Sequence, residues 1–441
     1  MVIKNKNILI YGVGKSGFSV LKYLLKKNIN AYVFDDNKEI LNRYKKNALP
    51  KDKTFWKSIN LVVISPGIDK RNNEFLQFFI NENVQIISEL EFGFNLINTK
   101  NVISVTGTNG KTTTCELLCD VLSNFGKSYK CGNVGLPITS ICEKVKKEDY
   151  VVIEASSFQL EDVVKFKPHI AIITNFAFDH LNRYNNFNDY VKAKLNIVKN
   201  LTEKDFLIVN EEIQIEKMIK TTAKIVEFST KKEIKGVFAS DGSIFYNDGN
   251  LTEKILQVSD INLKGVGNLE NVLAIVACVI CLKLDVEKAV NSIKNFATIE
   301  HRCERISVIN GIEFVNDSKA TNIHATLNAI KQINTKVHLL LGGSDKGENF
   351  DNLFSVLPKN VYTYLFGSTT NKMVISAINC HFKNFKICNN MQNALEKAFL
   401  NAKKGELVLL SPACASFDEF KNYEERGKLF KEWVLKLNEK F

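Results

Sequence analysis

The sequence predicts an α/β protein of about three domains, each built on a sheet of mostly parallel strands. Its 441 residues exceed what one typical hydrophobic core accommodates. Short apolar runs alternate with segments of helical periodicity along most of the chain, which is the pattern of successive βαβ units. We therefore predict a Rossmann-like doubly wound sheet in residues 1–92, a central sheet of P-loop type in residues 93–298, and a C-terminal Rossmann-like sheet in residues 299–441.

The first domain opens with a dinucleotide-type fingerprint. Residues 7–11 (NILIY) form a predicted buried strand that leads into a GxGxxG turn at residues 12–17, and a helix follows. The next strand ends at Asp35 and Asp36, about 20 residues on, where an acid would hold a ribose hydroxyl. Alone, this pattern favours NAD, but any nucleotide diphosphate satisfies the same geometry. A third predicted strand ends at residues 65–67 (Ser-Pro-Gly).

The central domain opens with a predicted phosphate-binding loop. The strand of residues 102–105 is followed by TGTNG at 106–110, and Lys111 then opens a helix. Glycines allow the backbone N–H groups and the positive helix N-terminus to point at phosphate oxygens. Lys111 can reach the β- and γ-phosphates, and the Thr112 hydroxyl can ligate Mg²⁺. The loop departs from a strict Walker A motif at Val105, and the alternative is a glycine-rich turn with a solvated lysine.

Two further strand ends in the central domain carry groups that could bind a metal. The strand of residues 150–153 delivers Glu154 to the place of a Walker B carboxylate, although a solvated strand end is the alternative. His180 follows the next predicted strand, which runs parallel to the first; a lone histidine is more often packed and hydrogen-bonded. Lys192 and Lys194 lie in a predicted helix and by composition are surface lysines.

The rest of the chain continues the α/β pattern. Turn signals between short apolar runs predict a small β-meander inserted at residues 237–263, and a long apolar helix begins near residue 265. In the last third, polar residues gather at strand ends, where open α/β sheets bind their ligands. Residues 416–419 match a capping box that opens the last helix, whose positive end suits a substrate carboxylate.

Composition limits the possible functions. The net charge is +11, but the lysines are scattered, so we expect a mild attraction for anionic substrates and no nucleic-acid partner. No apolar run reaches the length of a transmembrane helix, and the N-terminus lacks a signal-peptide pattern. The ten cysteines have no disulfide-framework spacing, which indicates a reducing cytoplasm. Cys278 and Cys281 form a CxxC inside an apolar helix, and we predict core residues there rather than a zinc site.

Five strings together resemble the Mur ligase family, which builds the peptide stem of bacterial peptidoglycan: TGTNGKTT, EASSFQLE, DHLNRY, HRCER and NDSKATN. The resemblance covers the whole chain. GVGKSG near the start and SPACASFDEFKNYEERG near the end are similar to the branch that adds D-glutamate. The resemblance implies that ATP converts the carboxylate of UDP-N-acetylmuramoyl-L-alanine to an acyl phosphate, which the amine of D-glutamate then attacks. It also implies small-molecule substrates and no NAD. Separately from the resemblance, we expect a cytoplasmic monomer with no membrane partner.

The resemblance assigns roles to individual residues. The catalytic residues would be Lys111, Glu154, His180 and Lys194. Two Mg²⁺ ions would be held by Thr112, Glu154, His180 and Lys194, the last as a carbamate formed with CO₂. ATP would contact Gly107, Thr108, Asn109, Gly110, Lys111, Thr112, Thr113, Asn268, Asn271, Arg302 and Asp317. The UDP substrate would contact Gly14, Lys15, Ser16, Asp35, Asp36, Ser65, Pro66, Gly67 and Asn133. D-Glutamate would contact Lys319, Thr321, Lys346, Ser416, Phe417 and Tyr423.

Three positions depart from the family pattern. Gly267 stands where a histidine usually precedes the first asparagine, Asn182 replaces the usual aspartate, and Asn37 stands where a basic residue is often found. Weaker contacts to adenine, to the region of His180 and to the UDP-sugar are expected at these positions.

Competing classes explain only parts of the chain. A Rossmann dehydrogenase leaves the loop at 106–113 and the third domain without a function, and a P-loop regulatory or motor ATPase predicts hydrolysis without an acceptor. Folylpolyglutamate synthase, which shares the family's fold, lacks the N-terminal UDP-binding domain.

Overall fold

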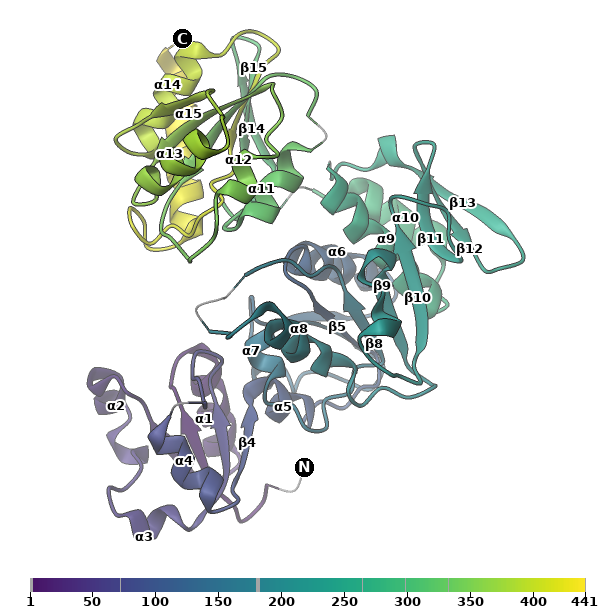
Figure 1. Ribbon diagram of the computed structural model, residues 1–441. Helices are drawn as coiled ribbons and strands as arrows, with labels where there is room; N and C mark the ends of the chain where they lie inside the picture. Colours follow the sequence, from purple (N-terminus) through teal and green to yellow (C-terminus); the bar gives the residue numbers. More distant parts are fainter. Residues whose placement is uncertain are drawn as a thin grey trace. The chain divides into compact units, whose positions relative to one another are not determined.

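In this computed structural model, residues 3–71, 73–179, 183–263, 265–297, 299–331 and 333–440 are described. They form three β-sheets with associated helices, which can be followed by colour in Figure 1. The chain divides into two compact units. The first contains Met1–Phe176, Asn188–Leu256 and Val272–Ile293, and the second contains Ala177–Phe187, Gln257–Asn271 and Lys294–Phe441. The α/β class is confirmed, while the domain boundaries at residues 92 and 298 stay predictions.

The N-terminal sheet is fully parallel, in the order β2-β1-β3-β4. Its strands are β1 (Asn7–Tyr11), β2 (Ala31–Phe34), β3 (Ile59–Ile64) and β4 (Gln85–Ser88). Its helices are α1 (Lys15–Lys26), α2 (Lys38–Arg43), α3 (Lys53–Trp56), α4 (Glu74–Asn81) and α5 (Glu89–Phe94). Helices α1 and α4 contribute to two separate hydrophobic clusters, through Leu24 and Phe79 among others. The strands are therefore covered on both faces, which explains their continuous apolar sequences.

The central sheet has the order β13-β12-β11-β10-β9-β8-β5-β7-β6. Its strands are β5 (Val102–Thr106), β6 (Ser128–Gly132), β7 (Tyr150–Glu154), β8 (Ile170–Ile173), β9 (Phe206–Asn210), β10 (Lys224–Ser229), β11 (Gly236–Ser240), β12 (Ser243–Asn247) and β13 (Thr252–Gln257). The predicted β-meander is present, but it extends this sheet as edge strands, because β11 pairs with β10 in parallel and with β12 through a hairpin. The associated helices are α6 (Lys111–Ser123), α7 (Ser157–Leu160), α8 (Phe187–Leu195), α9 (Val266–Cys281) and α10 (Val286–Asn295).

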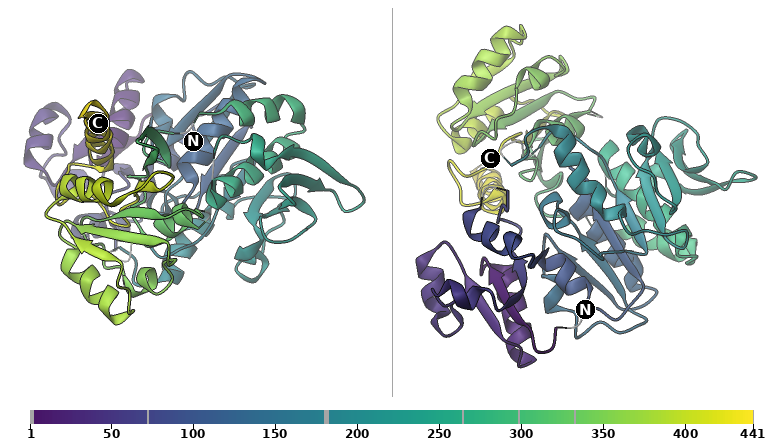
Figure 2. Two further views of the ribbon diagram at one scale, coloured as in Figure 1. Left: turned by 90° about the horizontal axis from the view of Figure 1, so that it is seen from above. Right: turned by 60° about the horizontal axis from the view of Figure 1, so that its bottom comes forward.

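The third sheet has the order β14-β15-β19-β16-β17-β18, with β14 antiparallel to β15 and the other pairs parallel. Its strands are β14 (Glu304–Ile309), β15 (Ile312–Asn316), β16 (Val337–Gly342), β17 (Val361–Phe366), β18 (Phe385–Ile387) and β19 (Leu407–Leu410). Helices α11 (Ile323–Ile330), α12 (Asp351–Phe354) and α13 (Thr370–Asn379) pack in one hydrophobic cluster. Helices α14 (Met391–Asn401) and α15 (Tyr423–Lys440, yellow in Figure 2) pack in another, so both faces are covered.

The predicted start of the last helix is wrong. Helix α15 begins at Tyr423, and the Asn422 side chain accepts the N–H of Glu425 at 2.8 Å. Ser416 instead lies in a separate turn, where its carbonyl accepts the N–H of Phe420. Asn422 is as suitable an N-cap as Ser416, and it too is followed by a glutamate three residues later. The sequence therefore contains two possible starts for this helix, and the helix begins at the second.

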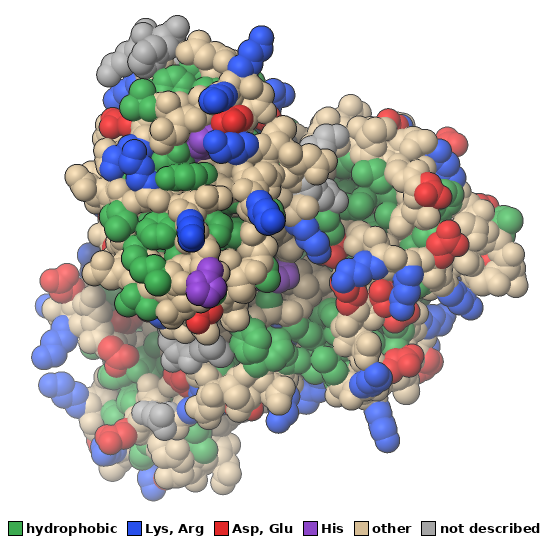
Figure 3. Space-filling view, turned by 45° about the horizontal axis from the view of Figure 1, so that its top comes forward, with side chains coloured by type: hydrophobic (Ala, Val, Ile, Leu, Met, Phe, Trp, Pro, Cys, Tyr) green, Lys and Arg blue, Asp and Glu red, His purple; other side chains and the backbone are tan. Residues whose placement is uncertain are grey.

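No helix in the described part of the chain is long and apolar enough to cross a membrane. On the face shown in Figure 3, Lys and Arg side chains are interspersed with Asp and Glu instead of forming one basic patch. Each of the ten cysteines is a free thiol.

Candidate active site

The phosphate loop connects β5 to α6 and has the backbone that its sequence predicts. Gly107 and Gly110 adopt φ angles of 145° and 85°, which disfavour other residues. A Cβ on Gly107 would also lie 2.0 Å from the Thr174 hydroxyl. Both glycines are therefore required for the tight turn that brings the chain into the N-terminus of α6.

The end of β8 fixes this loop and decides which of its N–H groups remain available. Asn175 accepts the N–H of Thr108 on its carbonyl at 3.0 Å and that of Asn109 on its side chain at 2.9 Å. Within the described chain, the N–H groups of Gly110, Thr112 and Thr113 have no recorded acceptor. This is the usual state of a first helical turn, and such N–H groups can donate to an anion.

Two lysines converge on one carbonyl of the loop. Lys111 Nζ donates to the carbonyls of Gly107 and Thr108 at 2.9 and 2.8 Å. Lys194 Nζ donates to Gly107 at 2.7 Å and lies 4.6 Å from the centre of the Tyr190 ring. The Tyr190 hydroxyl in turn shares a 3.1 Å hydrogen bond with the Thr108 hydroxyl. Helix α8 thus holds the loop through two side chains, and positive charge is concentrated beside it.

Lys194 corrects the composition-based expectation of a surface lysine, because it is only 1% exposed, whereas Lys192 is exposed. The two residues point to different surroundings because they lie two positions apart on a helix.

Glu154 is buried at the end of β7, the strand beside β5, and is not a solvated strand end. Its Oε1 atom accepts the side-chain N–H of Asn133 at 3.0 Å. Its Oε2 atom is buried and has no hydrogen-bond partner among the described residues. A buried carboxylate oxygen without a donor is costly unless a cation balances it, so this group fits a metal ligand. Of the other candidate ligands, Thr112 is the second residue of α6 and His180 lies outside the described residues, as does Asn182.

The predicted UDP residues follow β1, β2 and β3, except Asn133, which follows β6 of the central sheet. Asp35 accepts the N–H of Val13 at 2.8 Å, and the Ser65 hydroxyl donates to the carbonyl of Gly12 at 2.7 Å. These bonds join the three strand ends. Gly14 precedes α1 without a side-chain cap, which leaves the first turn of α1 to bind an anion.

Two other residues of the predicted UDP site, Asp36 and Lys15, contact groups of the protein itself. Asp36 accepts the hydroxyl proton of Tyr11 at 2.8 Å, and Lys15 Nζ lies 3.4 Å from the carbonyl of Gly135. Asn37, one of the departures from the family pattern, caps α2 by accepting the N–H of Glu39 at 2.9 Å.

In the second compact unit, Asp317 is buried at the end of β15. It accepts the hydroxyl proton of Ser411 at 2.8 Å and the N–H of Cys303 at 3.2 Å. Burial raises the pKa of the Asp317 carboxyl to about 6, although these donors and the charge of Arg302 lower it. Asn268 and Asn271 lie together in the first turns of α9, and no recorded hydrogen bond joins them to Asp317.

The predicted D-glutamate residues form two pairs and two separate positions. Lys346 Nζ lies 3.4 Å from the Thr321 hydroxyl and 3.9 Å from the Asp179 carboxylate. Lys319 Nζ lies 4.0 Å from the centre of the Tyr423 ring. Two members have no recorded contact with these pairs: Ser416, which is buried, and Phe417, which is 73% exposed.

Arg426 was not among the site residues that the sequence predicted. It is fully buried, and its guanidinium donates to the hydroxyl and carbonyl of Ser318 at 3.0 and 2.8 Å. It also donates to the carbonyls of Cys414 and Ala415 at 3.1 to 3.2 Å. The planar fork of arginine thus joins the loop that follows β15 to the loop that follows β19. The string YEERG, noted in the sequence, contained this residue without indicating its burial.

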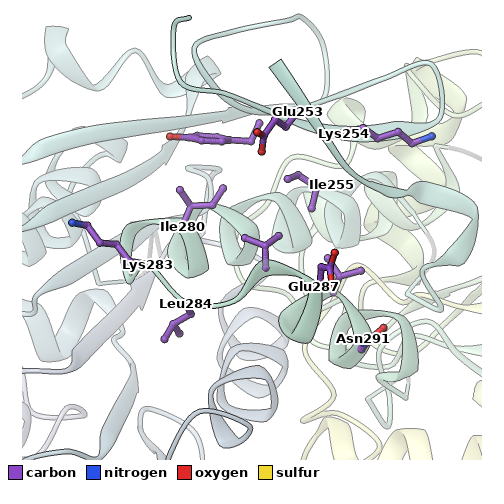
Figure 4. A pocket seen from close by; sticks show the side chains of 11 residues that line it. Glu253, Lys254, Ile255, Ile280, Lys283, Leu284, Glu287 and Asn291 are labelled. Atoms are coloured by element: carbon purple, nitrogen blue, oxygen red, sulfur yellow. The ribbon is translucent and has the colours of Figure 1, made fainter. Parts of the chain in front are cut away.

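A surface hollow lies between β13 and the helices α9 and α10. Figure 4 shows its lining, which includes Glu253, Lys254, Ile280 and Glu287. None of the predicted site residues lines it, so the hollow is not part of the candidate active site.

Three family models match successive parts of the chain. Residues 6–88 match the Mur ligase MurD-like N-terminal domain, residues 105–279 match the Mur ligase middle domain, and residues 301–414 match the Mur ligase glutamate ligase domain.

Curated relatives match the chain over nearly its full length. The UDP-N-acetylmuramoylalanine–D-glutamate ligase of Caldicellulosiruptor bescii is 35% identical over 456 residues, which cover 99% of each chain. The enzyme of the same name from Alkaliphilus oremlandii is 36% identical over 454 residues, covering 99% of this chain and all of the relative.

Solved structures show the same fold. UDP-N-acetylmuramate–alanine ligase MurC from Thermotoga maritima has a TM-score of 0.59 at 20% identity, covering 98% of this chain and 99% of its own. MurF ligase from Thermotoga maritima in complex with ADP also has a TM-score of 0.59, at 16% identity, covering 99% of this chain and 95% of its own.

Proposed function

The chain belongs to the Mur ligase family, and we propose that it uses ATP to join D-glutamate to UDP-N-acetylmuramoyl-L-alanine in the synthesis of peptidoglycan precursors. The observation that carries this proposal is the full-length identity of about 35% to ligases of that name. The phosphate loop also supports the proposal, because Lys111 and Lys194 donate to it and the buried carboxylate of Glu154 lies on the neighbouring strand. These groups suit the phosphoryl transfer that such a ligase carries out.

The first step is phosphoryl transfer. A carboxylate oxygen of the UDP substrate attacks the γ-phosphorus of ATP, and the bond to ADP breaks to leave an acyl phosphate. The free N–H groups at the start of α6 and the ammonium of Lys111 offset the charge on the transferring group. In the second step the neutral amine of D-glutamate attacks the acyl carbon, loses a proton and expels phosphate.

We assign the metal site to Thr112, Glu154, His180 and Lys194, with Lys194 as a carbamate. The unpaired Oε2 atom of Glu154 supports this assignment, and Asn133 orients the carboxylate through its other oxygen. Bound Mg²⁺ would neutralise phosphate charge and align the reacting groups. Addition of CO₂ to the neutral amine of Lys194 would release a proton and place an anion beside the loop, where the side chain is already buried.

We place the UDP group at the ends of β1, β2 and β3, and the two D-glutamate carboxylates at the Lys346–Thr321 and Lys319–Tyr423 pairs. Each pair supplies one cation, which matches the two negative charges of the acceptor. We also propose a monomer that acts in the cytoplasm, which is consistent with ten free thiols.

Phosphate release with each substrate omitted in turn tests the function. Release should require ATP, Mg²⁺, UDP-N-acetylmuramoyl-L-alanine and D-glutamate together, because an amine consumes the acyl phosphate. Equal turnover with L-lysine or meso-diaminopimelate in place of D-glutamate would refute the proposal.

A further inference from the structure

Glu348 is a partly buried carboxyl group that phosphoryl transfer does not use. It lies two residues after Lys346, and its Oε2 atom accepts the N–H of Ile323, the first residue of α11, at 3.0 Å. It therefore joins the loop that carries Lys346 to the segment that carries Thr321. Its Oε1 atom is buried and has no hydrogen-bond partner in the described part of the chain.

The charges around Glu348 are mostly negative. Asp345 lies on the same loop and pairs with Lys372 at 2.9 Å. Asp179 faces the loop from another segment, 3.9 Å from Lys346 Nζ, so Lys346 already has an acidic neighbour. Burial, opposed by the bond from Ile323, together with the charge of Asp179 raises the pKa of Glu348 to about 7, although Lys346 lowers it.

The remaining neighbours do not offset this negative charge. The Cys414 thiol interacts electrostatically with Glu348, but burial raises the pKa of that thiol to about 12, so it stays neutral. The N–H of Ile323 already donates to Oε2. Among the described residues Oε1 therefore has no donor, which makes the ionised form of Glu348 costly at this position.

We propose that Glu348 takes up a proton when the acidic acceptor binds beside Lys346, so that acceptor binding weakens as pH rises through neutrality. This inference rests on the proposed D-glutamate site and adds a proton to it. An arriving carboxylate repels ionised Glu348 and competes with it for Lys346. A proton from solvent on Oε1 removes the repulsion and converts the orphaned acceptor into a donor.

Glutarate is a suitable probe, because it has the two carboxylates of D-glutamate and no amine. Ordinary carboxyl pKa values are about 4, so the charge of glutarate is nearly constant between about pH 6.5 and about pH 8.5. Its inhibition constant against D-glutamate should rise at least about fivefold over that range in the wild-type protein. In Glu348→Gln, which is neutral and can still accept the N–H of Ile323, the constant should stay near the low-pH wild-type value throughout.

Glu396→Gln, on the exposed face of α14, is the matched control and should keep the wild-type pH dependence. Calorimetric titration of the wild-type protein with glutarate in two buffers of different ionisation enthalpy measures proton uptake directly, without any variant. Competition by glutarate with no pH dependence and no proton uptake would overturn the inference and leave the function intact. Absence of D-glutamate-dependent phosphate release would instead reject the proposed function itself.

Discussion

The phosphate loop and the proposed acceptor site differ in how firmly their cations are held. At the loop, Lys111 of α6 and Lys194 of α8 donate to backbone carbonyls at 2.7 to 2.9 Å. In the acceptor site, the contacts of Lys346 with described residues are longer, at 3.4 Å to the Thr321 hydroxyl and 3.9 Å to the Asp179 carboxylate. Backbone carbonyls of one strand–loop–helix unit bind both cations of the first site, although Lys194 itself comes from α8, whereas Lys346 contacts only side chains, which two other segments supply among the described residues.

This difference predicts that substitutions of the residues around the phosphate loop reduce kcat, while substitutions in the acceptor site mainly weaken the binding of D-glutamate. Four predictions test this distinction, in order of decreasing effect.

Lys194→Ala should reduce kcat by at least about 1,000-fold, because it removes a charged group beside the transferring phosphoryl. Added acetate should restore part of the activity if a carbamate is the working form. Lys192→Ala, on the exposed side of α8, is the control and should behave like wild type. Steady-state phosphate release measures all three. If Lys194→Arg were fully active and acetate had no effect, the ammonium bound to Gly107 would be the functional group.

Glu154→Gln should lower kcat by about 100-fold at limiting Mg²⁺ and raise the Mg²⁺ concentration needed for half-maximal rate. The substitution keeps the side-chain volume and an acceptor for Asn133, but it removes the negative charge. Titration of activity with Mg²⁺ gives the comparison, with exposed Glu148→Gln as the control. Wild-type activity of Glu154→Gln at low Mg²⁺ would remove Glu154 from the metal site.

Arg426→Lys should raise the KM for D-glutamate by about 10- to 100-fold, because one ammonium cannot bond to both loops, and lost bonds to a charged group cost about 1.5–3 kcal/mol. The KM for the UDP substrate should change little, since its proposed site lies on the N-terminal sheet. Exposed Arg305→Lys is the control. Equal increases in both Michaelis constants, together with a lower Tm, would mean that Arg426 contributes only to stability.

Lys346→Ala should raise the KM for D-glutamate by about 10-fold, the factor that corresponds to about 1.4 kcal/mol, and leave the KM for ATP nearly unchanged. Measuring both constants decides between the acceptor site and an ATP contact. A raised KM for ATP with an unchanged KM for D-glutamate would contradict the proposed pocket.

Much of the fold could be predicted because its signals are local. The buried strand at residues 102–106, the glycines of the following loop and the helix from Lys111 were all readable from adjacent residues. The start of α15 was not, because Ser416 and Asn422 offered similar caps a few residues apart. The sheet membership of β11 to β13 was also missed, since pairing with β10 depends on residues that hairpin periodicity does not specify.

A few consecutive residues were enough to predict the conformation of the phosphate loop, because its glycines and the start of α6 are local features. The burial of ionisable groups, in contrast, could not be predicted, because it depends on contacts between residues far apart in the chain. Lys194 meets the carbonyl of Gly107 across 87 residues, and Arg426 meets Ser318 across 108. The sequence around Lys192 and Lys194 does not distinguish the exposed lysine from the buried one, and the sequence around Glu348 does not indicate that it is partly buried. Their burial, and therefore their charge chemistry, depends on what distant segments pack against them.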